Sequence, residues 1–135
     1  MEKRIIPAEL GHLEEATGFV EELLKKYGCP QKTQLQIRLA VEEIFVNIAS
    51  YAYPSGKGEA EILCGFLPDP ERIRICISDS GIVFDPLAKE DADTSEEALM
   101  AREGGLGILL VKSMMDSVRY VRRDGRNVLT VEKRL

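Results

Sequence analysis

The sequence predicts a two-layer α/β sandwich in which helices pack on a mixed sheet. Two long helical patterns fill the chain up to Pro54, and strand patterns with one late helix fill the rest. No internal repeat and no linker-like segment interrupts this order. A length of 135 residues is enough for one domain and short for two, so residues 1–135 are expected to form a single domain.

The N-terminal part predicts a short strand and then a helix. Residues 3–6 (Lys-Arg-Ile-Ile) are expected to form the strand, which Pro7 ends. In residues 9–27, apolar side chains recur at the spacing of one helix face. Gly28 and Pro30 follow directly, and both residue types are typical of the end of a helix.

A second helix is predicted from Thr33 to about Tyr53. Thr33 and Gln36 have the form of a capping box, in which two side chains bond free backbone N–H groups at the start of a helix. One apolar stripe of this helix must face the sheet, and it consists of Ile37, Val41, Ile44, Ile48 and Ala52.

Two strands are predicted after a turn at residues 54–58. They lie near residues 59–67 and 71–78. In the second strand, isoleucines alternate with arginines and a cysteine, so the isoleucines are expected to share one face of the sheet.

The last third of the chain predicts a loop, a helix and a hairpin. Residues 87–103 are acidic and poor in large apolar side chains, which predicts a mobile loop with one short helical turn. A third helix is predicted at residues 108–115. The hairpin comprises residues 117–123 and 127–134 and turns at Asp124-Gly125.

Composition favours a cytoplasmic protein that binds neither nucleic acid nor a membrane. The formal net charge of −5 argues against a nucleic-acid binder, which usually carries a basic excess. No apolar run approaches the length that a bilayer requires, and the segment 1–4 is unlike the start of a signal peptide. Cys29, Cys64 and Cys76 form no C-x-x-C pair and predict small buried side chains in a reducing compartment.

The second predicted helix carries the first candidate site. Glu43 and Asn47 are one turn apart, so their side chains project together beside the apolar stripe. A carboxylate beside an amide oxygen suits a hard cation such as magnesium, or the activation of a hydroxyl group. Glu42 points away and is expected to pair with Arg38. A solvated polar edge is the alternative interpretation of this motif.

The second candidate site follows the isoleucine-rich strand. Asp79 lies at the end of that strand, and Gly81 comes two residues later. The carboxylate can accept a hydrogen bond from a ligand amine, and the glycine lets backbone approach closely. A plain β-turn is the alternative.

The third candidate site is a glycine-rich start of a helix. Glycines let backbone come near an anion, and the first N–H groups of a helix have no partner within it. The segment is neither a Walker A loop nor a Rossmann fingerprint. A flexible loop is the alternative interpretation. Its residues are Gly104, Gly105, Leu106 and Gly107.

Together and in this order, the three motifs resemble the N, G1 and G2 boxes of the Bergerat ATPase and kinase superfamily. Within it, the chain looks most like the anti-sigma-factor serine/threonine kinases. The resemblance covers essentially the whole chain and implies the Bergerat ATP-binding fold, an α+β sandwich with a mostly antiparallel sheet and helices on one face. It is carried by AVEEIFVNIASYAYPSGKGEAEI, ISDSGIVFDP and GGLGILLVKSMMDSVRYVRRDGRNVLTVEKRL.

The resemblance implies ATP and Mg²⁺ as ligands and assigns roles to the three motifs. Asn47 should bind magnesium, Asp79 the adenine amino group, and Glu43 should act as the general base. Residues 87–103 should form the ATP lid. The ATP-binding residues are then Asn47, Asp79, Gly81, Gly104, Gly105, Leu106 and Gly107.

The chain departs from the family pattern at two positions. Tyr51 stands where a histidine is common after the N box, and Val83 replaces the second glycine of D-x-G-x-G. Neither position carries a chemical role assigned above. Arg102 precedes the glycines and could reach a phosphate or a lid glutamate. His12, the one histidine, is expected at the surface of the first helix.

The implied function is an ATP-dependent serine/threonine kinase in a partner-switching circuit. It would phosphorylate a small anti-sigma-factor antagonist of the STAS type, with a sigma factor as a further partner and a homodimer as the assembly. Two alternatives stay open at this point. One is a non-catalytic switch that binds ATP and gates a protein interface, and the other is a protein-binding domain with a decayed pocket.

Overall fold

A computed structural model of the chain describes residues 1–54, 56–85, 87 and 105–135. The predicted lid beyond residue 87, Arg102 and Gly104 therefore lie outside the described residues. The single helix predicted at residues 9–27 is divided into a short 3-10 helix and an α-helix. The elements are β1 (Glu2–Pro7), η1 (Leu10–His12), α1 (Leu13–Lys26), α2 (Gln31–Tyr51), β2 (Glu59–Leu67), β3 (Arg72–Asp79), α4 (Gly105–Met114), β4 (Ser117–Arg123) and β5 (Arg126–Arg134).

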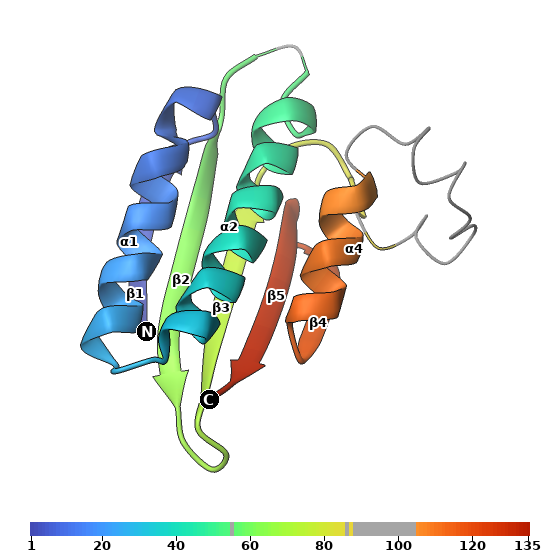
Figure 1. Cartoon of the computed structure of the whole chain (residues 1–135). Helices are drawn as coiled ribbons and strands as arrows, with labels where there is room; N and C mark the ends of the chain where they lie inside the picture. The colour runs from blue at the N-terminus through green and yellow to red at the C-terminus, as the bar shows by residue number, and fades with distance from the viewer. Residues whose placement is uncertain (55, 86, 88–104) are drawn as a thin grey trace.

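The strands form one sheet in the order β1-β2-β3-β5-β4. The helices α1, α2 and α4 lie on one face of it, with α2 in the middle (Figure 1). The predicted two-layer sandwich with a mostly antiparallel sheet is confirmed. The described strands contain no parallel pair that would make the sheet mixed, because even the non-consecutive neighbours β3 and β5 run in opposite directions.

The predicted alternation in β3 gives the sheet one buried face and one open face. Ile73, Ile75 and Ile77 are at most 1% exposed and pack under the helices. Arg72 and Arg74 lie on the opposite face. The predicted stripe of α2 is also confirmed, since its five residues are all buried.

The end of α1 follows the prediction. Gly28 has a φ of 74°, a left-handed conformation that glycine adopts without strain. The N–H of Cys29 can then donate to the carbonyl of Leu24 at 3.1 Å, the bond of a Schellman motif. The hairpin turn is confirmed in the same way, because Asp124 and Gly125 both have positive φ as a type I′ turn requires.

The start of α2 differs from the prediction. The helix begins at Gln31, ahead of the expected capping box at Thr33, and no side chain caps it. Pro30 precedes the first turn, and its fixed φ and missing N–H are compatible with a helix start. Gln34 donates from Nε2 to the carbonyl of Cys29 at 2.8 Å, which ties the preceding chain to this turn.

The predicted pair of Glu42 with Arg38 does not form. The Nε atom of Arg38 instead lies 3.0 Å from Oε1 of Glu21, on α1. The reason is tertiary: α1 and α2 pack side by side, so the carboxylate of the neighbouring helix is in reach (Figure 1).

The predicted burial of the cysteines is confirmed for two of them. All three are free, and Cys29 and Cys64 are buried, whereas Cys76 is partly exposed because it lies on the open face of β3. Burial raises the pKa of the Cys64 thiol to about 12, which keeps it protonated. Within the part of the chain that the structure describes, no helix is both long and apolar enough to cross a bilayer.

A cluster of three charges crosses the open face of the sheet. Glu132 on β5 accepts from Nε of Arg72 at 3.2 Å and from Nε of Arg74 at 2.5 Å. Burial by itself raises the pKa of Glu132, but the hydrogen bonds and charges of Arg74 and Arg72 outweigh it, so the pKa lies below its usual value of 4.5.

Because its folded pKa is lowered, Glu132 stabilises the fold fully above its unfolded pKa, and this contribution is lost as pH falls through the folded pKa. The free energy of unfolding, measured with denaturant from about pH 6 to about pH 3, should decrease more steeply for wild type than for Glu132→Gln. Glu22→Gln, at an exposed position of α1, is the control. Equal slopes for wild type and Glu132→Gln would contradict this account of the cluster.

Candidate functional site

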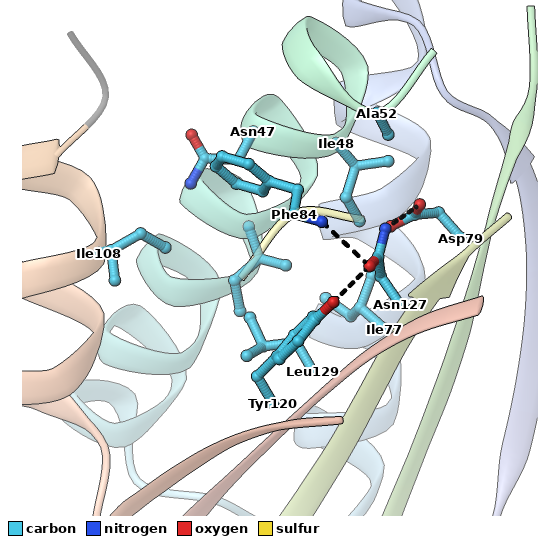
Figure 2. A pocket seen from close by; sticks show the side chains of 11 residues that line it. Asn47, Ile48, Ala52, Ile77, Asp79, Phe84, Ile108, Tyr120, Asn127 and Leu129 are labelled. Atoms are coloured by element: carbon cyan, nitrogen blue, oxygen red, sulfur yellow. Dashed lines mark hydrogen bonds between the residues drawn. The ribbon is translucent and has the colours of Figure 1, made fainter. Parts of the chain in front are cut away.

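A pocket opens where the C-terminal half of α2, the end of β3 and the start of α4 meet (Figure 2). These three segments lie at one end of the molecule (Figure 1). Most of the pocket lining is apolar and a few polar side chains converge in it, which is typical of small-molecule sites. The residues that line it are Ile44, Asn47, Ile48, Ala52, Ile77, Asp79, Phe84, Ile108, Tyr120, Asn127 and Leu129.

Buried polar side chains concentrate in this pocket. Among the described residues they are Thr17, Asn47, Asp79 and Asn127. Thr17 donates to the carbonyl of Leu13 within α1 at 3.2 Å and so has a local structural role. The other three line the pocket. Because burial of a polar group costs free energy unless a partner compensates it, their gathering makes this pocket the candidate site.

Asn47 brings a buried polar group into the pocket. Its residue is 7% exposed, and its amide makes no hydrogen bond with the described residues. Figure 2 shows the amide turned toward the side of the pocket where Ile108 of α4 lies. A buried amide in this state is destabilising on its own, and a ligand that supplies a partner would relieve the cost.

Glu43 lies one turn before Asn47 and outside the pocket lining. Its carboxylate packs against Gly107 in the first turn of α4. A Cβ atom on Gly107 would lie 2.7 Å from Cδ of Glu43 and closer still to Oε2. The missing side chain at Gly107 therefore makes room for the Glu43 carboxylate, and the first and third sequence motifs meet here.

The structure describes only part of the remaining glycine-rich motif. α4 begins at Gly105, so the first N–H groups of this helix point out of its N-terminal end. Gly104 lies outside the described residues, as does the side chain of Leu106. The start of α4 stands at the pocket end of the molecule (Figure 1).

Asp79 is 3% exposed and ends β3 inside the pocket. Its Oδ1 atom accepts from the N–H of Gly81 at 2.9 Å and from Nδ2 of Asn127 at 2.9 Å. Asn127 is also its direct neighbour in the β3–β5 register. The carboxylate is thus held by two donors on one oxygen.

Gly81 is required because the backbone of Ala52 lies close to it, whereas the sequence suggests the close approach of a ligand. A Cβ atom there would lie 2.7 Å from the carbonyl carbon of Ala52 and closer to its oxygen. The same carbonyl accepts from the N–H of Ile82 at 2.9 Å. The glycine lets the turn after β3 pack on the C-terminal end of α2, so the backbone that it approaches is the protein's own.

Gly81→Ala should destabilise the protein by about 1–3 kcal/mol, because the new methyl group meets backbone that cannot move aside. Gly18→Ala is the matched control. A Cβ atom at Gly18 has no neighbour within 4 Å, and alanine favours the helix, so this change should stabilise by about 0.5–1 kcal/mol. Thermal unfolding measures both. A Gly81→Ala protein as stable as wild type would contradict the packing described above.

The two departures from the family pattern lie outside the pocket lining, next to Phe84. Tyr51 stacks on Phe84, with ring centroids 5.8 Å apart. Val83 is 67% exposed. The position of the missing glycine is therefore open to solvent, where a larger side chain is accommodated.

Sequence reasoning misses Asn127, Tyr120 and Phe84 as parts of the pocket. A usable signal exists for Asn127. It shares with the apolar Leu129 and Val131 the face of β5 that points to the core. A polar residue on a core-facing position of a strand is the buried polar group that needs explanation.

Comparison with known proteins identifies a family and several relatives. Residues 6–133 match the family of histidine kinase-like ATPase domains. The serine-protein kinase RsbW of Listeria monocytogenes serovar 1/2a is 30% identical over 97 residues, which cover 69% of this chain and 61% of that protein. An RsbW of Bacillus cereus is 31% identical over 97 residues, covering 69% and 59%. The matched part thus spans about three fifths of the length of these relatives.

Solved structures share the fold at low sequence identity. A chain of the SiaB–SiaC complex from Pseudomonas aeruginosa superposes with a TM-score of 0.62 at 15% identity, covering 100% of this chain and 90% of that one. The histidine kinase domain of the blue-light activated histidine kinase from Erythrobacter litoralis EL346 gives 0.61 at 15% identity, covering 90% and 60%. The predicted Bergerat fold is confirmed, and the family implies that ATP is the nucleotide used. This chain belongs to the histidine kinase-like ATPase family.

Proposed function

We propose that this chain is an ATP-dependent serine/threonine protein kinase of the anti-sigma-factor type, which phosphorylates a small STAS-like antagonist in a partner-switching circuit. The gathering of Asn47, Asp79 and Asn127 in one pocket beside the start of α4 carries the proposal. Similarity to the serine-protein kinase RsbW supports the reaction. The similar chain in the SiaB–SiaC complex comes from a two-protein assembly, which supports a protein partner.

In this proposal the site binds both the adenine and the phosphates of ATP. Asp79 accepts a hydrogen bond from the adenine amino group, and Gly81 lies on the adenine side. The backbone N–H groups of Gly104, Gly105, Leu106 and Gly107 bind the phosphates at the start of α4. The buried amide of Asn47, which has no hydrogen-bond partner among the described residues, fits a magnesium ion, because this cation prefers oxygen ligands and keeps phosphates among them. Magnesium would neutralise charge on the transferred phosphoryl group.

Glu43 is the proposed general base. The acceptor hydroxyl gives its proton to the Glu43 carboxylate while its oxygen bonds to the γ-phosphorus, and ADP leaves with the electron pair of the broken P–O bond. The contact of Glu43 with Gly107 supports this role, because Gly107 belongs to the proposed phosphate site. A sigma factor as second partner and a homodimer belong to the same proposal and rest on the motif resemblance. A cytoplasmic location belongs to it as well and rests on the composition of the chain.

The test is direct. The purified protein is incubated with labelled ATP, magnesium and a panel of STAS-like antagonist proteins, and labelled sites are mapped by mass spectrometry. We expect one antagonist to be labelled on a serine or threonine. Labelling of none, combined with an antagonist affinity that still depends on ATP, would replace the kinase by a non-catalytic nucleotide switch.

A further inference from the structure

Asn127 is the most highly connected polar side chain of the pocket. It is 6% exposed, and its amide takes part in five hydrogen bonds, three of which are drawn in Figure 2. The Nδ2 group donates to Asp79 Oδ1 at 2.9 Å and to the Ile82 carbonyl at 2.7 Å. The Oδ1 atom accepts from Tyr120 Oη at 2.6 Å, Arg122 Nη1 at 3.2 Å and Phe84 N at 3.3 Å.

These partners fix the orientation of the amide. Arg122 and the backbone N–H of Phe84 can only donate, so the oxygen of Asn127 must face them. The Ile82 carbonyl can only accept, so the NH₂ group must face it and Asp79. Burial raises the pKa of the Tyr120 hydroxyl, which therefore stays protonated and donates as well. The reversed amide would leave donors facing donors.

The fixed amide determines which oxygen of Asp79 is left for a ligand. Oδ1 already accepts from Gly81 and from Asn127. Oδ2 makes no hydrogen bond with the residues that the structure describes. Because Asp79 lines the pocket, a ligand that donates to Oδ2 would complete the hydrogen bonding of this buried carboxylate.

We propose that Asn127 is the positioning residue that holds Asp79 with Oδ2 as the acceptor for a ligand, and so makes the pocket select a purine with a 6-amino group. This inference rests on the proposed binding of ATP. The selection follows from geometry. An amine at position 6 can donate to Oδ2, whereas a purine with hydrogen there leaves the buried carboxylate oxygen without a partner.

The test compares ATP with purine riboside triphosphate, which has hydrogen in place of the 6-amine. Wild type should bind ATP about tenfold or more tightly than purine riboside triphosphate, as measured by equilibrium calorimetry with magnesium. Asn127→Asp keeps the shape of the side chain but places a carboxylate oxygen against Asp79. Its two affinities should agree within about twofold.

Thr130→Val is the matched control, because Thr130 lies on the same strand as Asn127, outside the pocket lining, and its hydroxyl bonds Cys76 and not Asp79. It should keep the wild-type affinity ratio. If thermal unfolding shows Asn127→Asp to be unfolded, Asn127→Ser replaces it with the same readout. The wild-type ratio in the Asn127 variant, or an equal loss of ratio in Thr130→Val, would overturn the inference. Wild type that binds neither nucleotide would instead refute the proposed function.

Discussion

Replacing Glu43 by glutamine is expected to slow phosphorylation of the antagonist by roughly a hundredfold or more, while ATP affinity stays near wild type. Glutamine preserves the shape that packs on Gly107 and loses only the ability to take a proton. Initial rates with labelled ATP and calorimetric titration measure the two quantities separately.

Glu42→Gln is the control, since it removes the same charge from the neighbouring position of α2, and the three atoms nearest to a Cβ on Gly107 all belong to Glu43 and none to Glu42. It should change neither rate nor affinity. Gly107→Ala approaches the contact from the other side, because its methyl group would displace the Glu43 carboxylate. It should also slow transfer in a folded protein. Phosphorylation by Glu43→Gln at the wild-type rate would refute the assignment of the base.

Asp79→Asn should weaken ATP binding by about ten- to a hundredfold. The amide oxygen can still accept from Gly81 and Asn127, so the fold is expected to persist. Its NH₂ group, however, then faces the adenine amine, and two donors meet where a donor and an acceptor are needed. Calorimetry with a non-hydrolysable ATP analogue measures the change.

Asp85→Asn serves as the control for this prediction. Asp85 lies outside the pocket lining and accepts from the N–H of Leu87 at 2.8 Å, which an asparagine oxygen can also do. Its ATP affinity should match wild type. An Asp79→Asn protein with wild-type affinity would mean that adenine binds elsewhere.

Much of the fold could be predicted because its determinants are local. The alternation in β3, the stripe of α2 and the glycine turn at Asp124-Gly125 each depend on residues close together in the sequence. The start of α2 is placed wrongly from the sequence because two local signals compete. A capping box at Thr33 is one of them, but Pro30 and the bond from Gln34 to Cys29 begin the helix earlier.

The site could be predicted less fully, because its decisive contacts join distant segments. Asn47 and Asp79 are found from their motifs and do line one pocket. The bond of Asp79 to Asn127 spans 48 positions and depends on the β3–β5 register. The contact of Glu43 with Gly107 depends on how α2 packs against α4. Neither register nor helix packing follows from spacing within a motif.

Binding of ATP with magnesium in this pocket is the central claim, and titration calorimetry tests it most directly. A non-hydrolysable ATP analogue is titrated into the folded protein with and without magnesium. Millimolar affinity or better is expected with magnesium, and weaker binding without it, since Asn47 is proposed to act through the ion. The absence of binding with magnesium present, in a sample shown to be folded, would contradict the account.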